Sequence, residues 1–374
     1  MANSVAAGFA LIIFAAVCGG AFALPIKLRR RFELENLYVV AATITMLILP
    51  LVVAGAVLPH WPHAISAVGA GVVWRGLGYG FAWGVGAIAF GYAISLVGLS
   101  IGYAVIMGIN TAVGSILPFI VMSSGDLFRT AGLVVLAGIA GCIVGVAICG
   151  WAGHLRERTS AIATSAAEGE AGGYSDRSHS AKTTTFVFGL GVCAISGVLS
   201  ACANLGFAFT SQVGLEAQKL GASSVMSTLA SWILVYWGGA AAMLGWFGGL
   251  QVKKGTWRRN LGAGSTHDLL LACLMGVLWF LAMIPYGMGA YYLGRLGTSV
   301  GWAINIAASL IVANILGFFT GEWSHASPTS RRVLWAGLVV LIFAMAILGE
   351  GNAIASRQQR ANVLSPQPSG RSAM

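Results

Sequence analysis

An uncharged stretch of fifty residues, 76–125, constrains this chain more than any other feature. It contains no Lys, Arg, Asp, Glu or His. As one straight helix it would be about 75 Å long, whereas the hydrocarbon core of a membrane is about 30 Å thick. The stretch must therefore turn back, and Gly98-Leu99-Ser100 is the natural place. The sequence predicts two membrane-crossing helices here, at residues 76–97 and 100–122.

A second run, residues 269–321, has the same arrangement, with Arg295 as its one charge and Gly294 at the point where it must turn. The two runs match at an offset of 196 and, beyond the turn, at an offset of 199. The matched positions are Trp83 with Trp279, Phe90 with Tyr286, Gly91 with Gly287, Gly98 with Gly294, and Gly102-Tyr103-Ala104 with Gly301-Trp302-Ala303. Such a repeat is typical of transporters that are built from two related halves. Chance alignment of glycines in a glycine-rich chain is the alternative.

Composition places the chain in the membrane. Hydrophobic residues make up 57% of it and charged residues 9%, compared with about 25% charged residues in soluble proteins. We therefore predict an all-α integral membrane protein. The formal charge of +10 would suggest nucleic acid in a soluble protein. Here the basic residues form short clusters between apolar runs, a pattern that sets membrane orientation, and no nucleic-acid partner is expected. The six cysteines lie in apolar segments, as buried free thiols do.

Apolar runs predict ten crossing helices, at residues 5–24, 37–58, 76–97, 100–122, 131–151, 186–209, 224–247, 269–292, 298–319 and 333–349. Residues 1–152 form one five-helix repeat and residues 186–349 the other. Because five is odd, the second repeat enters the membrane from the opposite face, so the fold is two inverted five-helix repeats. Residues 153–185 are polar and are predicted to be a flexible linker, and residues 350–374 a disordered tail. Three glycines on the fifth helix, Gly138, Gly141 and Gly145, predict a flat packing ridge.

Charge in the loops predicts the orientation. Fourteen of the 21 Lys and Arg residues lie in the first, third, fifth, seventh and ninth loops. The positive-inside rule places these loops in the cytoplasm, so both termini are expected to face outward. The basic cluster between Lys27 and Arg31, directly after the first helix, favours the same orientation.

Short motifs along the chain resemble a known family. They are Leu24-Pro25-Ile26-Lys27, Glu33-Leu34-Glu35, Leu49-Pro50, Leu58-Pro59 before Trp61, Trp83-Gly84-Val85-Gly86 with Gly91, Leu96-Val97-Gly98-Leu99-Ser100-Ile101-Gly102 with Gly108-Ile109, Trp302, Glu322-Trp323 and Arg331-Arg332. Together they resemble the bacterial L-rhamnose–proton symporter family, over nearly all of the chain except the linker and the tail. The resemblance implies the drug/metabolite transporter superfamily, whose ten-helix members consist of two inverted halves. It also implies a bacterial inner-membrane protein that imports L-rhamnose or a related 6-deoxy sugar with protons by alternating access.

Amide and aromatic side chains in the predicted helices indicate a sugar site. An unpaired polar group in lipid is costly, so a mid-membrane amide normally faces protein or a water-filled cavity. Sugar hydroxyls pair with such amides, and the C–H face of the ring packs on aromatic rings. Residues seven apart share a helix face, which places aromatics and amides of the two related hairpins at corresponding positions. The predicted substrate-binding residues are Trp83, Phe90, Tyr103, Asn110, Asn204, Trp279, Tyr286, Trp302 and Asn305.

Structural roles compete with this prediction. Trp302 and Tyr103 lie near helix ends and could belong to interfacial aromatic belts. The aromatics of the third and eighth helices could face lipid, and the asparagines could join helices by hydrogen bonds. Tyr286 follows Pro285 in mid-helix, where a kink would open a cavity.

Proton coupling needs a titratable group that the pathway exposes to each side in turn. The predicted helix interiors contain no Asp, Glu or His, so the candidates are Asp268, Glu35 and Glu322 at helix ends. Asp268 is preferred because it begins the helix that carries Trp279 and Tyr286. For each of them, a solvated helix end is the alternative.

Other classes of function fit less well. We expect no enzyme activity, no cofactor and no metal, because the histidines are scattered and the pair His60 and His63 is more typical of a surface turn. The expected partners are a small sugar, protons and the lipid bilayer, with a homodimer as a candidate assembly. Within the same fold, the alternative is a proton-independent facilitator or an exporter of another small neutral metabolite, because no mid-membrane carboxylate is predicted.

Overall fold

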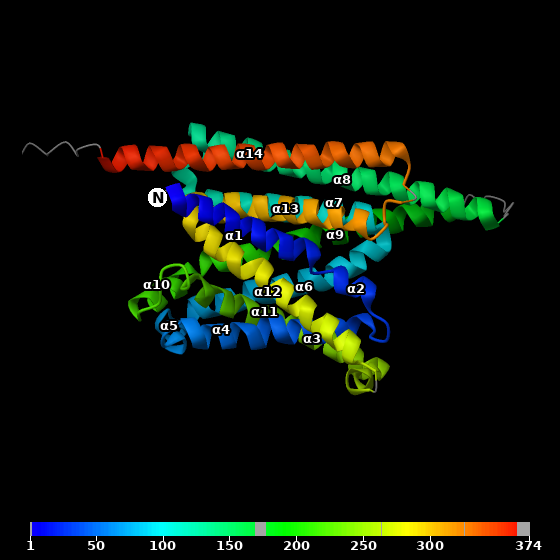
Figure 1. The fold of residues 1–374 in the computed structure, drawn as a ribbon, viewed down its shortest axis with the longest axis horizontal. Helices are drawn as coiled ribbons and strands as arrows, with labels where there is room; N and C mark the ends of the chain where they lie inside the picture. The colour runs from blue at the N-terminus through cyan, green and yellow to red at the C-terminus, as the bar shows by residue number, and fades with distance from the viewer. Residues whose placement is uncertain (1, 169–176, 263, 325, 365–374) are drawn as a thin grey trace, which may run out of the picture.

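The computed structural model describes residues 2–168, 177–262, 264–324 and 326–364, and within these ranges every regular element is a helix. The long helices lie side by side in one bundle (Figure 1). Nine stretches of the described residues are long and apolar enough to cross a membrane. One of them, Thr266–Phe319, has 54 residues and contains two long helices separated by a turn at Gly294. The chain is therefore a multi-pass membrane protein.

The helices are given in chain order. The first half contains α1 (Ala2–Ala21), α2 (Leu24–Leu28), α3 (Leu34–Ala42), η1 (Thr43–Ile48), α4 (Leu49–Val57), α5 (Trp61–Ala67), α6 (Ala70–Val97), α7 (Leu99–Ser123), η2 (Ser124–Asp126) and α8 (Thr130–Glu168). The second half contains α9 (Arg177–Phe209), α10 (Ser211–Lys219), α11 (Thr228–Lys254), η3 (Thr256–Leu261), α12 (Thr266–Leu293), η4 (Gly294–Leu296), α13 (Gly297–Phe319) and α14 (Pro328–Leu364).

The bundle has two ends, which we name by their content (Figure 1). The basic end holds residues 24–33, 253–262, 320–324 and 326–327. The terminal end holds the start of α1, the end of α14 and residues 58–69, 124–129, 210–227 and 294–296. The first, seventh and ninth loops thus gather at the basic end and the even-numbered loops at the terminal end, in agreement with the predicted order of crossings.

Glycine permits the two tight turns between neighbouring crossings. Gly98 (φ 89°) separates α6 from α7, and Gly294 (φ 76°) follows α12, at backbone angles that other residues rarely adopt. The two turns lie at opposite ends of α7. Leu99 follows the first turn directly, while Oγ of Ser123 donates a 3.5 Å hydrogen bond to the carbonyl of Arg295 in the second. Because α7 has 25 residues, the turns are about 37 Å apart along it.

Helices of the two halves interlock. α1 packs on α12 and α13, and α9 packs on α6 and α7. α8 and α14 run antiparallel along each other, since Val135 lies beside Gly351 and Cys149 lies beside Gly337. The three glycines that were predicted to form a packing ridge on the fifth helix face α14, which confirms that prediction.

Glycine also allows α6 and α11 to approach closely. A Cβ atom on Gly80 of α6 would overlap the carbonyl of Val235 in α11, and one on Gly238 of α11 would overlap the carbonyl of Leu77. Small residues at such crossings let backbones meet in a membrane, where apolar surface alone does not drive helices together. The contact fixes α11, which carries two aromatic residues of the site described below.

The second crossing was predicted to be one regular helix, and the structure differs. It is divided into α3, the π-helical turn η1 and α4. Pro50 follows η1 closely and lacks the backbone N–H that the carbonyl of Met46 would accept in a regular helix. A wider turn at this point accommodates the missing donor.

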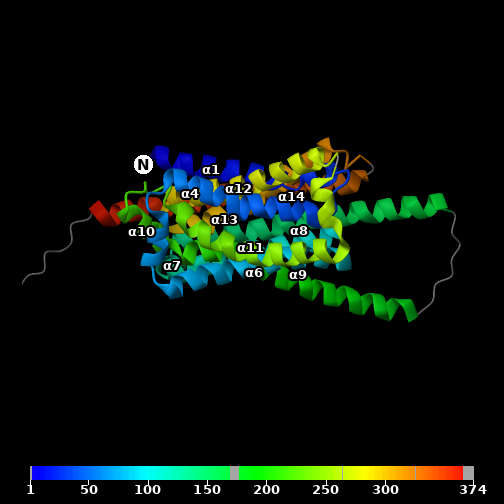
Figure 2. The same ribbon diagram turned by 90° about the horizontal axis from the view of Figure 1, so that it is seen from below.

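Two boundaries predicted from polarity are corrected by the structure. Residues 153–185, predicted to be a flexible linker, are helical up to Glu168 and again from Arg177, and residues 169–176 lie outside the described residues. Alanine is frequent in the first part and favours helix even without an apolar face. These parts of α8 and α9 project past the rest of the bundle (Figure 2). The tail predicted to be disordered from residue 350 continues α14 to Leu364, with Asn352 buried, and residues 365–374 lie outside the described residues.

Candidate functional site

Asn204 of α9 is completely buried and joins four helices. Its Nδ2 group donates hydrogen bonds to the carbonyls of Gly114 in α7 (2.7 Å) and Thr298 in α13 (3.1 Å). Its Oδ1 atom accepts a hydrogen bond from the hydroxyl of Tyr286 in α12 (2.5 Å). The Gly114 carbonyl is available because Pro118, four residues later in the same helix, has no backbone N–H. The proline thus creates the acceptor that holds this amide.

Trp302 of α13 is buried against α7. Its Nε1 group donates to the backbone carbonyl (3.4 Å) and to Oδ1 (3.3 Å) of Asn110. Gly114 makes room for the indole, because a Cβ atom there would overlap it. The Trp302 ring also packs edge to face on Tyr286, with ring centroids 5.2 Å apart. The two asparagines, the tyrosine and the tryptophan therefore form one connected polar and aromatic group.

A row of aromatic rings continues from this group through the interior. The ring centroids of Tyr286 and Trp232 are 6.3 Å apart, those of Trp232 and Tyr236 are 5.7 Å apart, and those of Tyr236 and Trp83 are 6.2 Å apart. The row reaches Trp279, whose ring is 5.7 Å from that of Trp83. We call the whole assembly the central cluster: Trp83, Asn110, Asn204, Trp232, Tyr236, Trp279, Tyr286 and Trp302.

The structure brings most of the predicted substrate-binding residues together. Six of them lie in the central cluster: Trp83, Asn110, Asn204, Trp279, Tyr286 and Trp302. Asn305 lies one helical turn after Trp302 and is 3% exposed. Phe90 and Tyr103 lie outside the central cluster, and their rings pack edge to face at 5.8 Å within the α6–α7 hairpin. Trp302 is buried, so it does not belong to an interfacial aromatic belt.

Two residues of the central cluster were missed from the sequence. Trp232 and Tyr236 are four residues apart on α11, so both lie on one face of the helix. This spacing was the available signal. The repeat drew attention to the two hairpins instead, and α11 lies outside both of them.

Asp268, near the start of α12, is 1% exposed and holds a loop in place. It accepts hydrogen bonds from the backbone N–H groups of three consecutive residues, Arg30 (3.0 Å), Arg31 (2.5 Å) and Phe32 (2.8 Å), and Nδ1 of His267 lies 3.0 Å from it. It is three turns, or about 16 Å, along α12 from the nearest residue of the central cluster. The carboxylate therefore ties the loop between α2 and α3 to the second half.

The other two candidate carboxylates also make ion pairs between the halves at the basic end. Glu35 is buried, and Nζ of Lys254 lies 3.3 Å from its Oε1 atom. The side chain of Glu322 is 34% exposed and pairs with Lys27 and, at 3.5 Å, with Arg156. All three candidates thus lie at the basic end and outside the central cluster.

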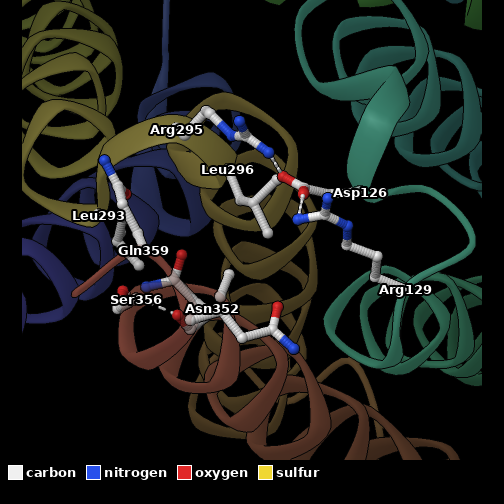
Figure 3. A pocket seen from close by; sticks show the side chains of 10 residues that line it. Asp126, Arg129, Leu293, Arg295, Leu296, Asn352, Ser356 and Gln359 are labelled. Atoms are coloured by element: carbon white, nitrogen blue, oxygen red, sulfur yellow. Dashed lines mark hydrogen bonds and ion pairs between the residues drawn. The ribbon is translucent and has the colours of Figure 1, made fainter. Parts of the chain in front are cut away.

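A cavity of about 200 Å³ lies at the terminal end (Figure 3). Asp126 at one side of it forms ion pairs with Arg295 and, at 3.4 Å, with Arg129. Asp126 belongs to the first half and Arg295 to the second, so an ion pair joins the halves at this end as well. Asn352 and Ser356 of α14 line the opposite side (Figure 3).

The chemistry of the central cluster suits a neutral, polyhydroxylated ligand. It offers amide, phenol and indole groups together with the faces of several rings, and none of its eight members is charged. Within the described part of the chain, no three His, Cys, Asp or Glu side chains are placed to hold a metal ion. His60 and His63 lie at the start of α5, where the N–H of His63 donates to the carbonyl of His60 (2.9 Å).

Comparison with known proteins agrees with this chemistry. The family model described as L-rhamnose-proton symport protein (RhaT) matches residues 1–354. The L-rhamnose-proton symporter of Escherichia coli (strain 55989 / EAEC) is 25% identical over 360 residues, which cover 94% of this chain and 100% of that protein. The L-rhamnose-proton symporter of Cronobacter sakazakii (strain ATCC BAA-894) is 27% identical over 364 residues, which cover 94% and 99%.

Proposed function

This chain belongs to the L-rhamnose-proton symport protein family, and we propose that it imports L-rhamnose or a related 6-deoxy sugar together with protons across a bacterial inner membrane. The family is one of transporters, so the chain is not an enzyme. At 25 and 27% identity to named symporters, the sugar itself is part of the proposal. The single observation that carries it is the central cluster, an uncharged group of amides and aromatic rings buried between the two halves.

Sugar recognition follows from the side chains of this cluster. Amides, a phenol and indole N–H groups exchange hydrogen bonds with sugar hydroxyls, while ring faces pack against the C–H face of a pyranose and its methyl group. A carboxylate or a phosphate would instead need a buried cation. The described residues of the cluster include no lysine or arginine, which favours a neutral substrate.

Two inverted halves provide the route by which the site is reached from each side. Three observations support them. The turns at Gly98 and Gly294 lie at opposite ends of α7. α1 packs on α12 and α13 just as its counterpart α9 packs on α6 and α7. Trp83 and Trp279, which the repeat relates, touch each other, as residues beside a pseudo-two-fold axis do.

Ion pairs between the halves suit alternating access. Asp126 and Arg295 join the halves at the terminal end, while Glu322 joins them to Lys27 and Arg156 at the basic end. Asp126 is buried, whereas Lys27 and Glu322 are partly exposed. An exposed pair contributes only about 0–1 kcal/mol, so the pair of Lys27 with Glu322 is exchanged easily when the basic end opens. The positive-inside rule places the basic end in the cytoplasm and both termini outside.

Glu322 fits proton coupling better than Asp268 does. Asp268 accepts three backbone N–H groups, and its protonation would leave these donors short of an acceptor. Glu322 is partly exposed and its partners are flexible side chains from the first half. It can therefore exchange a cation for a proton when the basic end opens.

A proton-independent facilitator is the second candidate function. The observation that favours it is that all three carboxylates lie at the basic end and none belongs to the central cluster. Export of another small neutral metabolite is a variant of the same candidate.

Uptake by membrane vesicles tests the proposal. Cells that lack their own L-rhamnose transporter provide the vesicles, and uptake of radiolabelled L-rhamnose is measured with an imposed proton gradient and after its collapse by an ionophore. We expect accumulation that depends on the gradient and that related 6-deoxy sugars inhibit. Uptake and counterflow that are indifferent to the gradient would favour the facilitator. No uptake of any 6-deoxy sugar would refute the proposed substrate.

A further inference from the structure

Two buried donors in the central cluster have no hydrogen-bond partner among the described residues. Trp232 and Tyr236 of α11 are both completely buried. Among the residues that the structure describes, none accepts a hydrogen bond from Nε1 of Trp232 or exchanges one with the hydroxyl of Tyr236. Most buried side-chain polar atoms in native proteins are paired, so an unpaired one calls for an explanation. Two of them, one turn apart on a single helix face, point to a ligand or to a second conformation that binds one.

The surroundings place both donors within reach of the polar group around Asn204. A Cβ atom on Gly287 of α12 would lie 2.6 Å from Nε1 of Trp232, so this N–H faces the backbone directly after Tyr286. The Tyr286 hydroxyl is the group that bonds to Asn204. Tyr236 lies on the far side of Trp232, where its ring meets that of Trp83. The two donors therefore extend the polar surface of the cluster from Asn204 towards the Trp83–Trp279 pair.

A third unpaired atom, on α13, defines the chemistry of the ligand. Oδ1 of Asn305 is an acceptor that no described residue pairs with. Asn305 is four residues from both Gly301, which faces the Tyr286 ring, and Ser309, which faces Gly19 of α1. It therefore lies on the face of α13 that meets α1 and α12. A ligand must therefore offer acceptors to the two donors, on Trp232 and Tyr236, and a donor to the acceptor on Asn305.

Hydroxyl groups meet both needs, because each one donates and accepts. A carboxylate offers no hydrogen to Asn305, and an ammonium group offers no acceptor to Trp232 or Tyr236. We propose that Trp232 and Tyr236 bind hydroxyl groups of a neutral polyol or sugar and that Asn305 accepts from another hydroxyl of the same molecule. This assignment rests on the proposed function, because it places the ligand in the same central cluster and adds α11 to its walls.

In the present conformation the aromatic rings of the cluster also pack on two phenylalanines outside it, Phe280 and Phe207. The centroids of Tyr236 and Phe280 are 6.0 Å apart with nearly parallel rings, and those of Phe207 and Trp232 are 5.0 Å apart. A sugar ring enters between such faces when α11 and α12 separate. The C–H face of the sugar then takes the place of the contacts between aromatic rings, and its hydroxyls pair with Trp232, Tyr236 and Asn305.

Substitution of Tyr236 by Phe tests the assignment because it removes one oxygen atom and leaves the ring. We expect the dissociation constant for L-rhamnose, measured with purified protein, and the KM of uptake to rise about tenfold. The melting temperature without sugar should be unchanged or higher, because the lost hydroxyl had no partner. Trp246→Phe on the same helix and Tyr291→Phe on α12 are matched controls, since both side chains are exposed and outside the cluster.

Binding of a series of singly deoxygenated L-rhamnose analogues distinguishes contact with the sugar from a purely structural role of the Tyr236 hydroxyl. The analogue that lacks the hydroxyl bound by Tyr236 should bind equally to the wild type and to Tyr236→Phe, while the other analogues keep the tenfold difference. Wild-type affinity of Tyr236→Phe for L-rhamnose and for all analogues would overturn the assignment. A clear loss of melting temperature without sugar would also overturn it, because the hydroxyl would then have a structural partner.

The choice of sugars separates this inference from the proposed function. If the wild type ignores L-rhamnose and L-fucose but is stabilised by D-ribose, and Tyr236→Phe weakens that effect, the proposed substrate fails and the inference stands. If L-rhamnose binds and Tyr236→Phe binds it normally, the proposed function stands and the inference fails. Stabilisation by L-glutamate or putrescine alone, among the compounds tested, would refute the inference.

Discussion

Asn204 and Asn305 show how two similar residues take different roles. Both are buried amides in crossing helices, and Asn204 uses its donor and its acceptor to join α7, α9, α12 and α13. Asn305 keeps an acceptor without a partner among the described residues. We therefore assign Asn204 to holding the cluster together and Asn305 to contact with the ligand.

The substitution Asn305→Ala is expected to weaken sugar uptake without loss of the protein from the membrane. Loss of one hydrogen bond to a sugar hydroxyl weakens binding by about 1.4 kcal/mol, which corresponds to a tenfold higher KM. Asn314→Ala is the matched control on the same helix, because the Asn314 amide bonds to the carbonyl of Leu310 one turn earlier. Uptake kinetics together with immunoblots of the membrane fraction check the prediction. Equal kinetics for the two variants would remove Asn305 from the site.

The substitution Asp268→Asn is expected to reduce stability and leave coupling intact. The new NH2 group would face backbone N–H groups of the loop between α2 and α3, and each donor left without an acceptor costs about 1–3 kcal/mol. Thermal unfolding of the purified variant measures this loss. Uptake per folded molecule should still depend on the proton gradient.

Glu322→Gln is the comparison for this prediction, because the proposed coupling carboxylate is removed while its size is kept. Sugar uptake by Glu322→Gln should no longer respond to the gradient. If instead Asp268→Asn abolishes the response and retains normal stability, Asp268 carries the proton.

At the level of helices, the crossing of α6 and α11 determines where the aromatic row lies. Gly80→Ala would place a methyl group against the Val235 carbonyl, and overpacking of this kind costs about 1–3 kcal/mol. Gly78→Ala, two residues away, meets nothing within 4 Å and should be neutral or stabilising by up to about 1 kcal/mol. Melting temperature and uptake of the two variants test this, and a harmless Gly80→Ala would show that the two helices can separate at no cost.

Much of the helix pattern could be predicted from hydropathy and glycine. The need for two turns follows from length, because neither apolar run fits a membrane as one helix, and Gly98 and Gly294 mark their places. The ends of α8, α9 and α14 could not be found in this way. Polar sequence marks where a helix leaves the membrane, not where it stops, and alanine-rich polar stretches continue as helix in water. The π-helical turn before Pro50 could not be predicted either, because only the backbone geometry reveals it.

The candidate site was predicted in part, for a physical reason. The repeat identifies Trp83 and Trp279, which meet at the interface of the halves. It also equates Phe90 with Tyr286, yet Phe90 packs within its own hairpin while the Tyr286 hydroxyl reaches Asn204. In the proposed repeat, equivalent positions keep the backbone and lose the side-chain partners. The pairing of residues from four helices depends on tertiary packing that a single sequence does not reveal.

For the molecule as a whole, the proposed transport depends on two halves that cross the membrane in opposite directions. The ion pairs at the two ends, the interlocked packing of α1 and α9, and the meeting of Trp83 with Trp279 have a common explanation in that arrangement. One site between the halves is then reached from either face by the same kind of motion. This is the physical basis of the proposed transport.

The most direct measurement is the sidedness of the two glycine turns. Single cysteines are introduced at Leu99 and at Arg295, in a variant whose six native cysteines are replaced, and intact cells are treated with a membrane-impermeant maleimide. We predict that the cysteine at position 295 is labelled from outside and that the cysteine at position 99 is labelled only after the membrane is opened. Labelling of both positions from the same face would contradict the inverted halves and, with them, the central pathway.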